Sequence, residues 1–225
     1  MLFADRRDAG RRLAAELLTR SLKDPVVLAL ARGGVPVGFE IARALQAPLD
    51  VVLVRKIGAP DQPELALGAI ADGETPDLVM DHGIVAALHV SSQYIARTKS
   101  AALVEIERRR HAYLGDRPPV AIAGCTAIVV DDGVATGATT RVALRAARHR
   151  RPAHLVLAVP VAPADTLARL EHEVDLTVCL DTPADFWGVG QFYLDFTQVS
   201  DAEVADLLRQ AREAAPAALS QEDGR

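Results

Sequence analysis

Two adjacent carboxylates, Asp131 and Asp132, follow an apolar run and precede a turn of small residues. The apolar residues 127–130 favour a buried strand, and a helix is expected to begin at about Ala138. The turn between them therefore leads into a helix N-terminus, where free backbone N–H groups and threonine hydroxyls suit a phosphate monoester. Two carboxylates would repel a bare phosphate, but they can bind the diol of an attached sugar or a magnesium ion. This pattern predicts a sugar-phosphate site.

Competing nucleotide and nucleic-acid sites lack support in the sequence. It contains no G-x-x-x-x-G-K-[ST] motif, and no G-x-G-x-x-G opens a helix after a predicted strand. The formal net charge is −5 and the pI is near 5.7, which argues against a general nucleic-acid binder. A local cationic pocket for a small anion remains compatible with that charge.

Two further strand ends carry polar or glycine-rich turns. Arg32, Gly33 and Gly34 follow the apolar run 26–30, and Arg55 and Lys56 follow the run 51–54. Glycines permit close backbone approach, and arginine and lysine bind phosphate well. Lysine is rare here, with three among 25 cationic residues, so its place at a strand end is informative. The alternative for residues 32–34 is an ordinary tight turn with a surface arginine, and the alternative for Arg55 and Lys56 is a solvated strand end.

The elements that must position these turns alternate between strands and helices. Helical patterns at 35–45, 138–150 and 163–170 separate apolar runs at 26–30, 51–54, 127–130, 155–159 and 174–180. Continuous apolar runs fit strands covered on both faces, so we predict a doubly wound, mainly parallel α/β sheet flanked by helices. Ligands of such sheets bind beyond the carboxyl ends of the strands, where the three turns are expected to converge.

Several segments lie outside this alternation. Amphipathic helices are predicted at 8–19 and 201–214, a loop or ribbon at 59–80, and one long charged helix at 90–113. The arginine run 108–110 is typical of a solvated helix face. Residues 216–225 are predicted to form a frayed tail. Most of the nine aromatic residues gather between positions 186 and 196, which is informative in a chain so poor in them.

Length and composition limit the class of protein. With 225 residues, half of them hydrophobic, the chain can bury one sizeable core, and we predict a single domain over residues 1–215. Cys125 and Cys179 are far apart in sequence, which argues against a disulfide framework or a zinc site. The sequence shows neither an apolar signal-peptide region nor a stretch long enough to span a membrane. These features indicate a soluble, cytoplasmic protein.

Residues 128–140 resemble the signature of the type I phosphoribosyltransferases, an apolar strand, two acids and a short segment ending in T-G-x-T. The resemblance implies that Asp131 and Asp132 bind the ribose hydroxyls of phosphoribosyl pyrophosphate (PRPP). Arg32 with Gly33 and Gly34 is similar to the pyrophosphate loop of the family, and Arg55 and Lys56 would lie near the same group. The residues implied to bind the 5-phosphate are Ala135, Thr136, Gly137, Ala138, Thr139 and Thr140.

The resemblance also implies a division of the chain around the substrate. A mobile lid would occupy 59–113 and a small hood 181–199, with Phe186 or Trp187 stacking on a base. The alternative for the aromatic cluster is a small satellite core. Magnesium would be held mainly by substrate oxygens, with Asp131 and Asp132 as possible protein ligands. A homodimer is expected from the resemblance alone.

One departure from the family leaves the acceptor open. Hypoxanthine–guanine enzymes place an acid just before T-G, whereas this sequence has Ala135, as adenine-type members do. Proton transfer would come from Glu64 or Asp72, or be unnecessary. The expected reaction is transfer of phosphoribosyl to a nitrogen nucleophile, with a nucleobase favoured. The alternatives are a non-catalytic PRPP- or nucleotide-binding regulator and, more weakly, a phosphatase or hydrolase, for which no nucleophile or water-activating base stands out.

Overall fold

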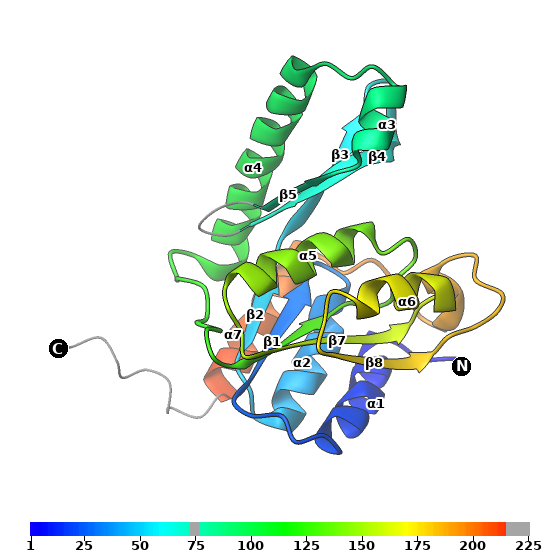
Figure 1. Ribbon diagram of the computed structural model, residues 1–225. Helices are drawn as coiled ribbons and strands as arrows, with labels where there is room; N and C mark the ends of the chain where they lie inside the picture. The colour runs from blue at the N-terminus through cyan, green and yellow to red at the C-terminus, as the bar shows by residue number, and fades with distance from the viewer. Residues whose placement is uncertain (73–76, 215–225) are drawn as a thin grey trace.

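The computed structural model describes residues 1–72 and 77–214 (Figure 1). Its centre is a five-stranded sheet in which every pair of neighbours is parallel. In spatial order the strands are β2 (Leu49–Val52), β1 (Pro25–Leu30), β6 (Thr126–Val130), β7 (His154–Val161) and β8 (Leu176–Asp181). The three central strands are almost entirely buried, as expected of parallel strands covered on both faces.

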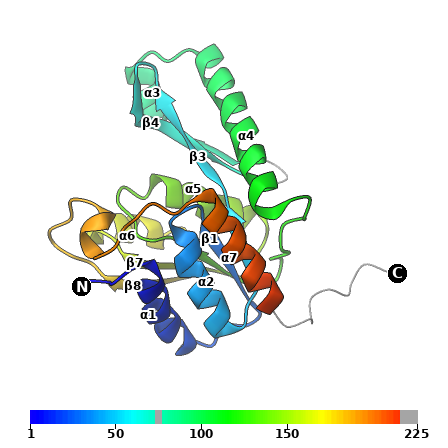
Figure 2. The same cartoon turned by 180° about the vertical axis from the view of Figure 1, so that it is seen from behind.

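Helices cover both faces of this sheet. On one face lie α5 (Ala138–His149) and α6 (Ala164–Glu171), whose apolar residues join the core cluster around β1, β6 and β7 (Figure 1). On the other face lie α1 (Arg6–Leu18), α2 (Gly34–Leu45) and α7 (Asp201–Ala214) (Figure 2). The chain therefore folds as the doubly wound, mainly parallel α/β structure that the sequence predicts.

The sheet has a switch point between β1 and β6. From β1 the chain passes through α2 to β2 on one side, while β6 leads on through α5 to β7 on the other. Ala29 pairs with Val130, so β1 and β6 end nearly level, whereas β7 continues to Val161, three residues past Ala158, which pairs with Val130. The turns that follow β1 and β6 must therefore diverge around a shared crevice, which is where open α/β sheets bind ligands.

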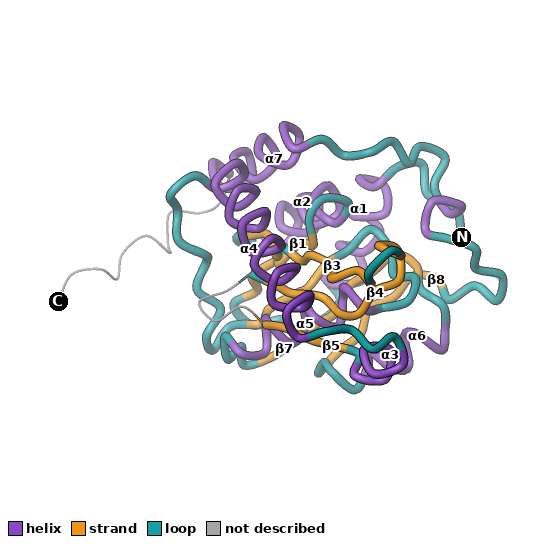
Figure 3. The backbone as a smooth tube through the Cα atoms, turned by 90° about the horizontal axis from the view of Figure 1, so that it is seen from above, coloured by secondary structure: helices purple, strands orange, loops and turns teal. Residues whose placement is uncertain are grey.

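An arm, formed by residues 54–72 and 77–114, stands out from the core (Figures 1 and 2), and seen from above it lies over the core (Figure 3). It contains an antiparallel sheet of β3 (Val54–Ala59), β4 (Gln62–Ala71) and β5 (Asp77–Met80), followed by α3 (His82–Ala87) and α4 (Ser92–Leu114). The expected ribbon at 59–80 is thus a pair of strands, and the expected helix at 90–113 is α4.

The arm corrects the prediction that Arg55 and Lys56 end the second parallel strand. That strand ends at Val52, and after Leu53 alone the chain continues as β3, which pairs with β4 instead of with β1. One uninterrupted apolar run serves two different sheets, so its pattern contains no signal for the break. Both basic residues therefore lie inside a strand of the arm.

The base of the arm is fixed to the core by packing and by a buried ion pair. Ala69 and Ala71 of β4 pack against Val142 and Ala146 of α5. At the end of β4, Asp72 accepts the N–H of Leu53 at 2.9 Å through Oδ1 and a guanidinium N–H of Arg110 at 2.9 Å through Oδ2. Burial raises the pKa of Asp72, although these two donors oppose the shift.

The expected hood region is joined to the N-terminal segment. Phe3 forms an isolated parallel bridge with Tyr193, and backbone hydrogen bonds link Phe3 to Phe192 and Leu194. A short 3₁₀ helix, η1 (Val189–Phe192), precedes this junction. The N-terminal segment and residues 192–193 thus contribute to one small apolar cluster that includes Val161 of β7.

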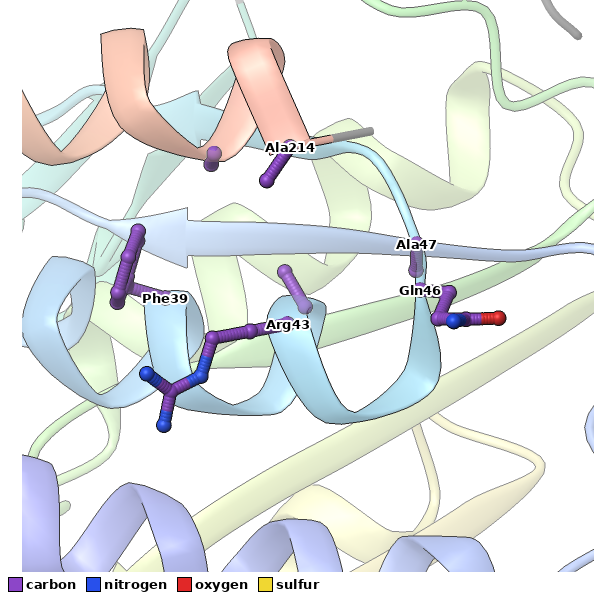
Figure 4. Close-up of a pocket in the computed structure, with 7 residues that line it drawn as sticks. Phe39, Arg43, Gln46, Ala47 and Ala214 are labelled. Carbon is purple, nitrogen blue, oxygen red and sulfur yellow. The ribbon is translucent and has the colours of Figure 1, made fainter. Parts of the chain in front are cut away.

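Three further features concern the cysteines, the helices and a cavity of the described residues. Both cysteines are free. Within residues 1–72 and 77–214, no helix combines the length and the apolar character needed to cross a membrane. A small cavity of about 130 Å³ lies between α2 and α7, at the opposite end of α2 from Gly34 (Figure 4); it is lined by Phe39, Ala42, Arg43, Gln46, Ala47, Ala211 and Ala214.

Candidate active site

The acid pair and the double-glycine turn lie against each other at the switch point. A Cβ on Gly34 would lie 2.6 Å from the Val130 carbonyl oxygen and 3.0 Å from Asp131 Cα. A Cβ on Gly33 would overlap the carboxylate of Asp132. A Cβ at Gly34 would thus meet backbone atoms, whereas one at Gly33 would displace the Asp132 carboxylate. The peptide bond between Ala31 and Arg32 that precedes them is cis. The two predicted turns form one site.

Asp131 and Asp132 are partly buried and electrostatically coupled. Burial raises the pKa of Asp131 well above its ordinary value, and the neighbouring charge of Asp132 raises it further. The backbone N–H of Asp132 donates to Asp131 Oδ1 at 2.9 Å, which opposes this rise. Two adjacent carboxyls that repel each other in a partly buried place are typical of a functional site, because this repulsion contributes nothing to the stability of the fold.

Arg6, at the start of α1, forms an ion pair with the second acid. Its Nε donates to Asp132 Oδ2 at 2.7 Å, and one terminal nitrogen donates to the Thr197 carbonyl at 2.8 Å. The side chains of Arg6 and Asp132 are only 10% and 14% exposed. A cation thus lies directly beside the acid pair, and it comes from an element that the sequence analysis treats only as a flanking helix.

Two aromatic residues of the hood complete the surroundings of this ion pair. The guanidinium carbon of Arg6 lies 3.9 Å from the ring centroid of Phe196, a cation–π contact. The hydroxyl of Tyr193 donates to the backbone carbonyl of Asp132 at 2.6 Å. Burial and the charge of Asp132 raise the pKa of Tyr193, so it remains a neutral donor. The aromatic cluster therefore supports the acid pair from the hood side.

The turn after the acid pair has the geometry of an anion-binding helix start. Gly137 is the N-cap of α5 with φ of 78°, a conformation that glycine adopts readily, and the helix begins at Ala138 as predicted. Ala135 and Thr136 are exposed, while Thr140 is buried. The carbonyl of Ala135 accepts the hydroxyl of Thr166 in α6 at 3.0 Å. The turn is thus anchored to α6 while its residues Ala135 and Thr136 remain exposed.

The predicted cations lie around this centre in different ways. Arg32 approaches Asp201, at the first turn of α7, with 3.5 Å between nitrogen and oxygen. In β3, Lys56 is exposed and pairs with Ala69, and so shares the strand face that packs toward α5. Arg55 is half-buried and lies on the opposite face. Of these three cations, Arg32 directly precedes the glycine turn, and Lys56 lies on the strand face that packs toward α5.

The two aromatic stacking candidates have different environments. Phe186 is half-buried and packs against Phe192, with 5.5 Å between ring centroids. Trp187 is 93% exposed, and its backbone N–H donates to Gln191 Oε1 at 2.8 Å. Val189, two residues further on, lies close enough to Gly133 that a Cβ there would be 2.5 Å from it. Trp187 is therefore the candidate whose ring is open to a ligand.

Asp72 and Glu64, the candidates for proton transfer, differ in how far the structure describes them. Both carboxylate oxygens of Asp72 are used by Leu53 and Arg110 at the base of the arm. This position gives Asp72 a structural role in holding the arm. The side chain of Glu64, like that of neighbouring Pro63, lies outside the described residues.

Three contributors to the site escape sequence reasoning: Arg6, Tyr193 and Thr197. Arg6 lies 126 positions from Asp132 in sequence and belongs to an arginine-rich helix start with no special pattern. Tyr193 donates its hydroxyl to a backbone carbonyl, and Thr197 accepts through its own backbone carbonyl, so neither contact depends on a recognisable pair of side chains. The clustering of aromatic residues at 186–196 is the one sequence signal for this region, and it does not show which residues the aromatic side chains contact.

The donor set available for a metal ion is small. Among the described residues, no group of three or more histidine, cysteine, aspartate or glutamate side chains is arranged to hold one. The acid pair offers two carboxylates, and one of them is already bound by Arg6. Magnesium commonly binds through one or two carboxylates together with substrate phosphates and water. The residues present therefore fit a magnesium ion that is held mainly by substrate oxygens.

The fold and this site place the chain in a known class of protein. Residues 4–197 match the family described as phosphoribosyl transferase domain, and the chain belongs to that family. Of the three strand-end turns that the family resemblance singles out, the acid pair and the double-glycine turn meet at the switch point, whereas Arg55 and Lys56 lie in β3 of the arm.

The relatives agree with this assignment. Two Mycobacterium tuberculosis proteins, from strains CDC 1551 and H37Rv, carry provisional phosphoribosyl transferase names and are 48% identical over 210 residues. The match covers 93% of this chain and 47% of each relative, so the chain spans about half the length of the curated relatives it matches. The crystal structure of TT1426 from Thermus thermophilus is 43% identical with a TM-score of 0.79, covering 93% of this chain and 99% of that one.

Proposed function

We propose that this protein is a phosphoribosyltransferase that uses PRPP and magnesium to transfer a phosphoribosyl group to a nitrogen nucleophile, with a nucleobase favoured, and releases pyrophosphate. The observation that carries the proposal is the contact between the double-glycine turn and the acid pair at the switch point. The start of α5, the proposed phosphate-binding element, follows that pair closely in sequence. Diol, monophosphate and pyrophosphate would thus each have a separate recognition element around one crevice.

The proposed mechanism assigns a positioning task to each element. Asp131 and Asp132 accept the ribose hydroxyls, and the backbone N–H groups at 135–140 bind the 5-phosphate. The turn at Gly33 and Gly34, with Arg32 and Lys56, binds the pyrophosphate as carbon 1 is attacked by the nitrogen of the acceptor. The carbon–oxygen bond to pyrophosphate breaks, the new carbon–nitrogen bond forms, and the acceptor loses a proton. Catalysis comes from positioning and charge stabilisation.

Magnesium, when bound through substrate oxygens and the acid pair, would offset charge on the leaving pyrophosphate. The arm would cover the crevice and limit access of water to the electron-poor carbon, since water would otherwise compete with the acceptor. Trp187 is the proposed stacking partner of a base. A homodimer in the cytoplasm is part of the same proposal.

The test is release of pyrophosphate from PRPP in the presence of magnesium with a panel of nucleobases and other amines. The proposal expects acceptor-dependent release by the wild-type protein and loss of release when Asp131→Asn and Asp132→Asn are combined. Tight PRPP binding without release for any acceptor would favour a regulatory protein on the same fold, a possibility supported by the absence of an acid at Ala135. Failure to bind PRPP would overturn both.

A further inference from the structure

We propose that Arg6 is a positioning residue for PRPP binding, which orients the carboxylate of Asp132 against the double-glycine turn and offsets one charge of the acid pair. The inference deepens the proposed function and rests on it. The motifs at 32–34 and 128–140 do not include this arginine, and its position follows from the contacts of residues 3–6 with residues 192–197.

The geometry of Arg6 restricts the carboxylate to one place. The guanidinium is fixed at three points: Nε on Asp132 Oδ2 at 2.7 Å, a terminal nitrogen on the Thr197 carbonyl at 2.8 Å, and its central carbon 3.9 Å from the Phe196 centroid. On the other side of the carboxylate, the space of a Gly33 Cβ is already occupied by Asp132. The carboxylate is therefore held between the arginine and the glycine turn.

The backbone of Asp132 is fixed independently of its side chain. Tyr193 donates from its hydroxyl to the Asp132 carbonyl at 2.6 Å, and Tyr193 is itself joined to Phe3 by a backbone bridge and a ring contact of 5.4 Å. Residues 3–6 and 193–197 thus form one brace around Asp132. The Arg6 side chain at the end of this brace is only 10% exposed, so its ion pair with Asp132 is a buried interaction and not a surface one.

The charge of Arg6 also addresses the repulsion that the site would otherwise present. PRPP carries two groups of phosphate charge, and two free carboxylates between them would oppose binding. Arg6 contacts Asp132 through Oδ2, so it offsets charge at the second acid while leaving Asp131 uncovered by an arginine contact. Both carboxylates can then accept ribose hydroxyls, while the net negative charge of the site is smaller than that of the acid pair alone.

The experiment measures PRPP affinity by calorimetry in the presence of magnesium for Arg6→Gln, Arg6→Lys and the control Arg11→Gln. Arg11 lies on the same helix with a side chain 52% exposed and 3.9 Å from Asp8. We expect Arg6→Gln to weaken binding about tenfold or more, Arg6→Lys to recover part of that loss because it restores the charge but not the three contacts of the guanidinium, and Arg11→Gln to leave binding unchanged. A general loosening of the fold would not be reversed by restoring the charge.

A second pair of variants tests whether Arg6 acts through Asp132. Adding Arg6→Gln to Asp132→Asn should weaken PRPP binding less than about twofold further, because the group that Arg6 orients has already been changed. The double variant leaves no unpaired carboxylate at position 132, so it remains informative if Arg6→Gln alone does not fold.

Three results would overturn the inference. One is wild-type affinity in folded Arg6→Gln, another is a loss as large in Arg6→Lys as in Arg6→Gln, and the third is a full tenfold further loss in the Asp132→Asn background. The wild-type protein separates the two proposals. If it does not bind PRPP, the proposed function fails and the Arg6 inference fails with it, whereas wild-type binding with an unaffected Arg6→Gln rejects the inference alone.

Discussion

Two partly buried carboxylate–arginine pairs occur in regions with different purposes, one in the candidate site and one at the base of the arm. Asp132 with Arg6 and Asp72 with Arg110 have similar distances, 2.7 and 2.9 Å, and all four side chains are less than one-fifth exposed. Each arginine comes from a helix distant in sequence. Judged by the ion pair alone, the two regions are equivalent.

The neighbours of the two pairs make the difference. Asp72 also accepts the backbone N–H of Leu53 at 2.9 Å, so both of its oxygens have protein donors and the pair joins strand, turn and helix. Asp132 instead follows a second acid directly in sequence and lies against the double-glycine turn. A nearby carboxylate, Asp50, raises the pKa of Asp72 as well, so the distinction between the two pairs rests on the contact of Asp132 with the glycine turn.

The largest expected effect separates stability from binding at the arm. Replacing Arg110 by Gln leaves Asp72 buried without its cation and should lower the free energy of unfolding by about 3 kcal/mol, a drop in Tm of roughly 6–12 °C. Because the pair is structural, PRPP affinity measured well below Tm should stay within about threefold of wild type. A folded Arg110→Gln protein that no longer binds PRPP would show that the two regions are not distinct.

The next effect should appear in binding and concerns the glycine turn. Gly34→Ala would place a Cβ 2.6 Å from the Val130 carbonyl oxygen and displace the turn from the acid pair. We expect PRPP affinity to fall about a hundredfold. Gly83→Ala, in the short helix α3 of the arm, is the matched control and should bind normally. Unchanged affinity of Gly34→Ala would mean that contact between the two turns is not needed.

A third effect depends on pH and on the coupled acids. Because burial and Asp132 raise the pKa of Asp131, its ionisation in the folded protein opposes folding increasingly as pH rises above the ordinary carboxyl range. Asp131→Asn removes this cost. Its Tm relative to wild type should therefore be higher at pH 8 than at pH 5, by at least about 2 °C. If the Tm of Asp131→Asn relative to wild type is the same at both pH values, or is lower at pH 8, the inferred cost of ionising Asp131 beside Asp132 is contradicted.

The smallest expected effect concerns the arm cation. Lys56 is exposed and faces the α5 side of the arm, so its contribution to pyrophosphate binding should be modest. Lys56→Gln is expected to raise the KM for PRPP about threefold to fivefold, while Lys99→Gln, in α4, is the control of equal charge change. If both variants behave alike, Lys56 acts only through overall charge.

The sequence predicts the core of the fold and the floor of the site because both depend on local pattern. Apolar runs, the small residues at 133–137 and the two glycines each have a short-range signature, and the structure brings the corresponding turns together. The division of one apolar run between β2 and β3 has no such signature. Arg6 is invisible for another reason: its partner is 126 residues away, and only the folded hood determines which arginine of α1 faces inward.

The central claim is that the acid pair, and not the arm pair, binds the sugar of PRPP. Calorimetry of PRPP with magnesium on wild type, Asp131→Asn combined with Asp132→Asn, and Asp72→Asn tests it most directly. The account predicts binding by wild type, no measurable binding by the double variant although it folds, and near-wild-type binding by Asp72→Asn. Unchanged affinity in the double variant, or a loss confined to Asp72→Asn, would contradict it.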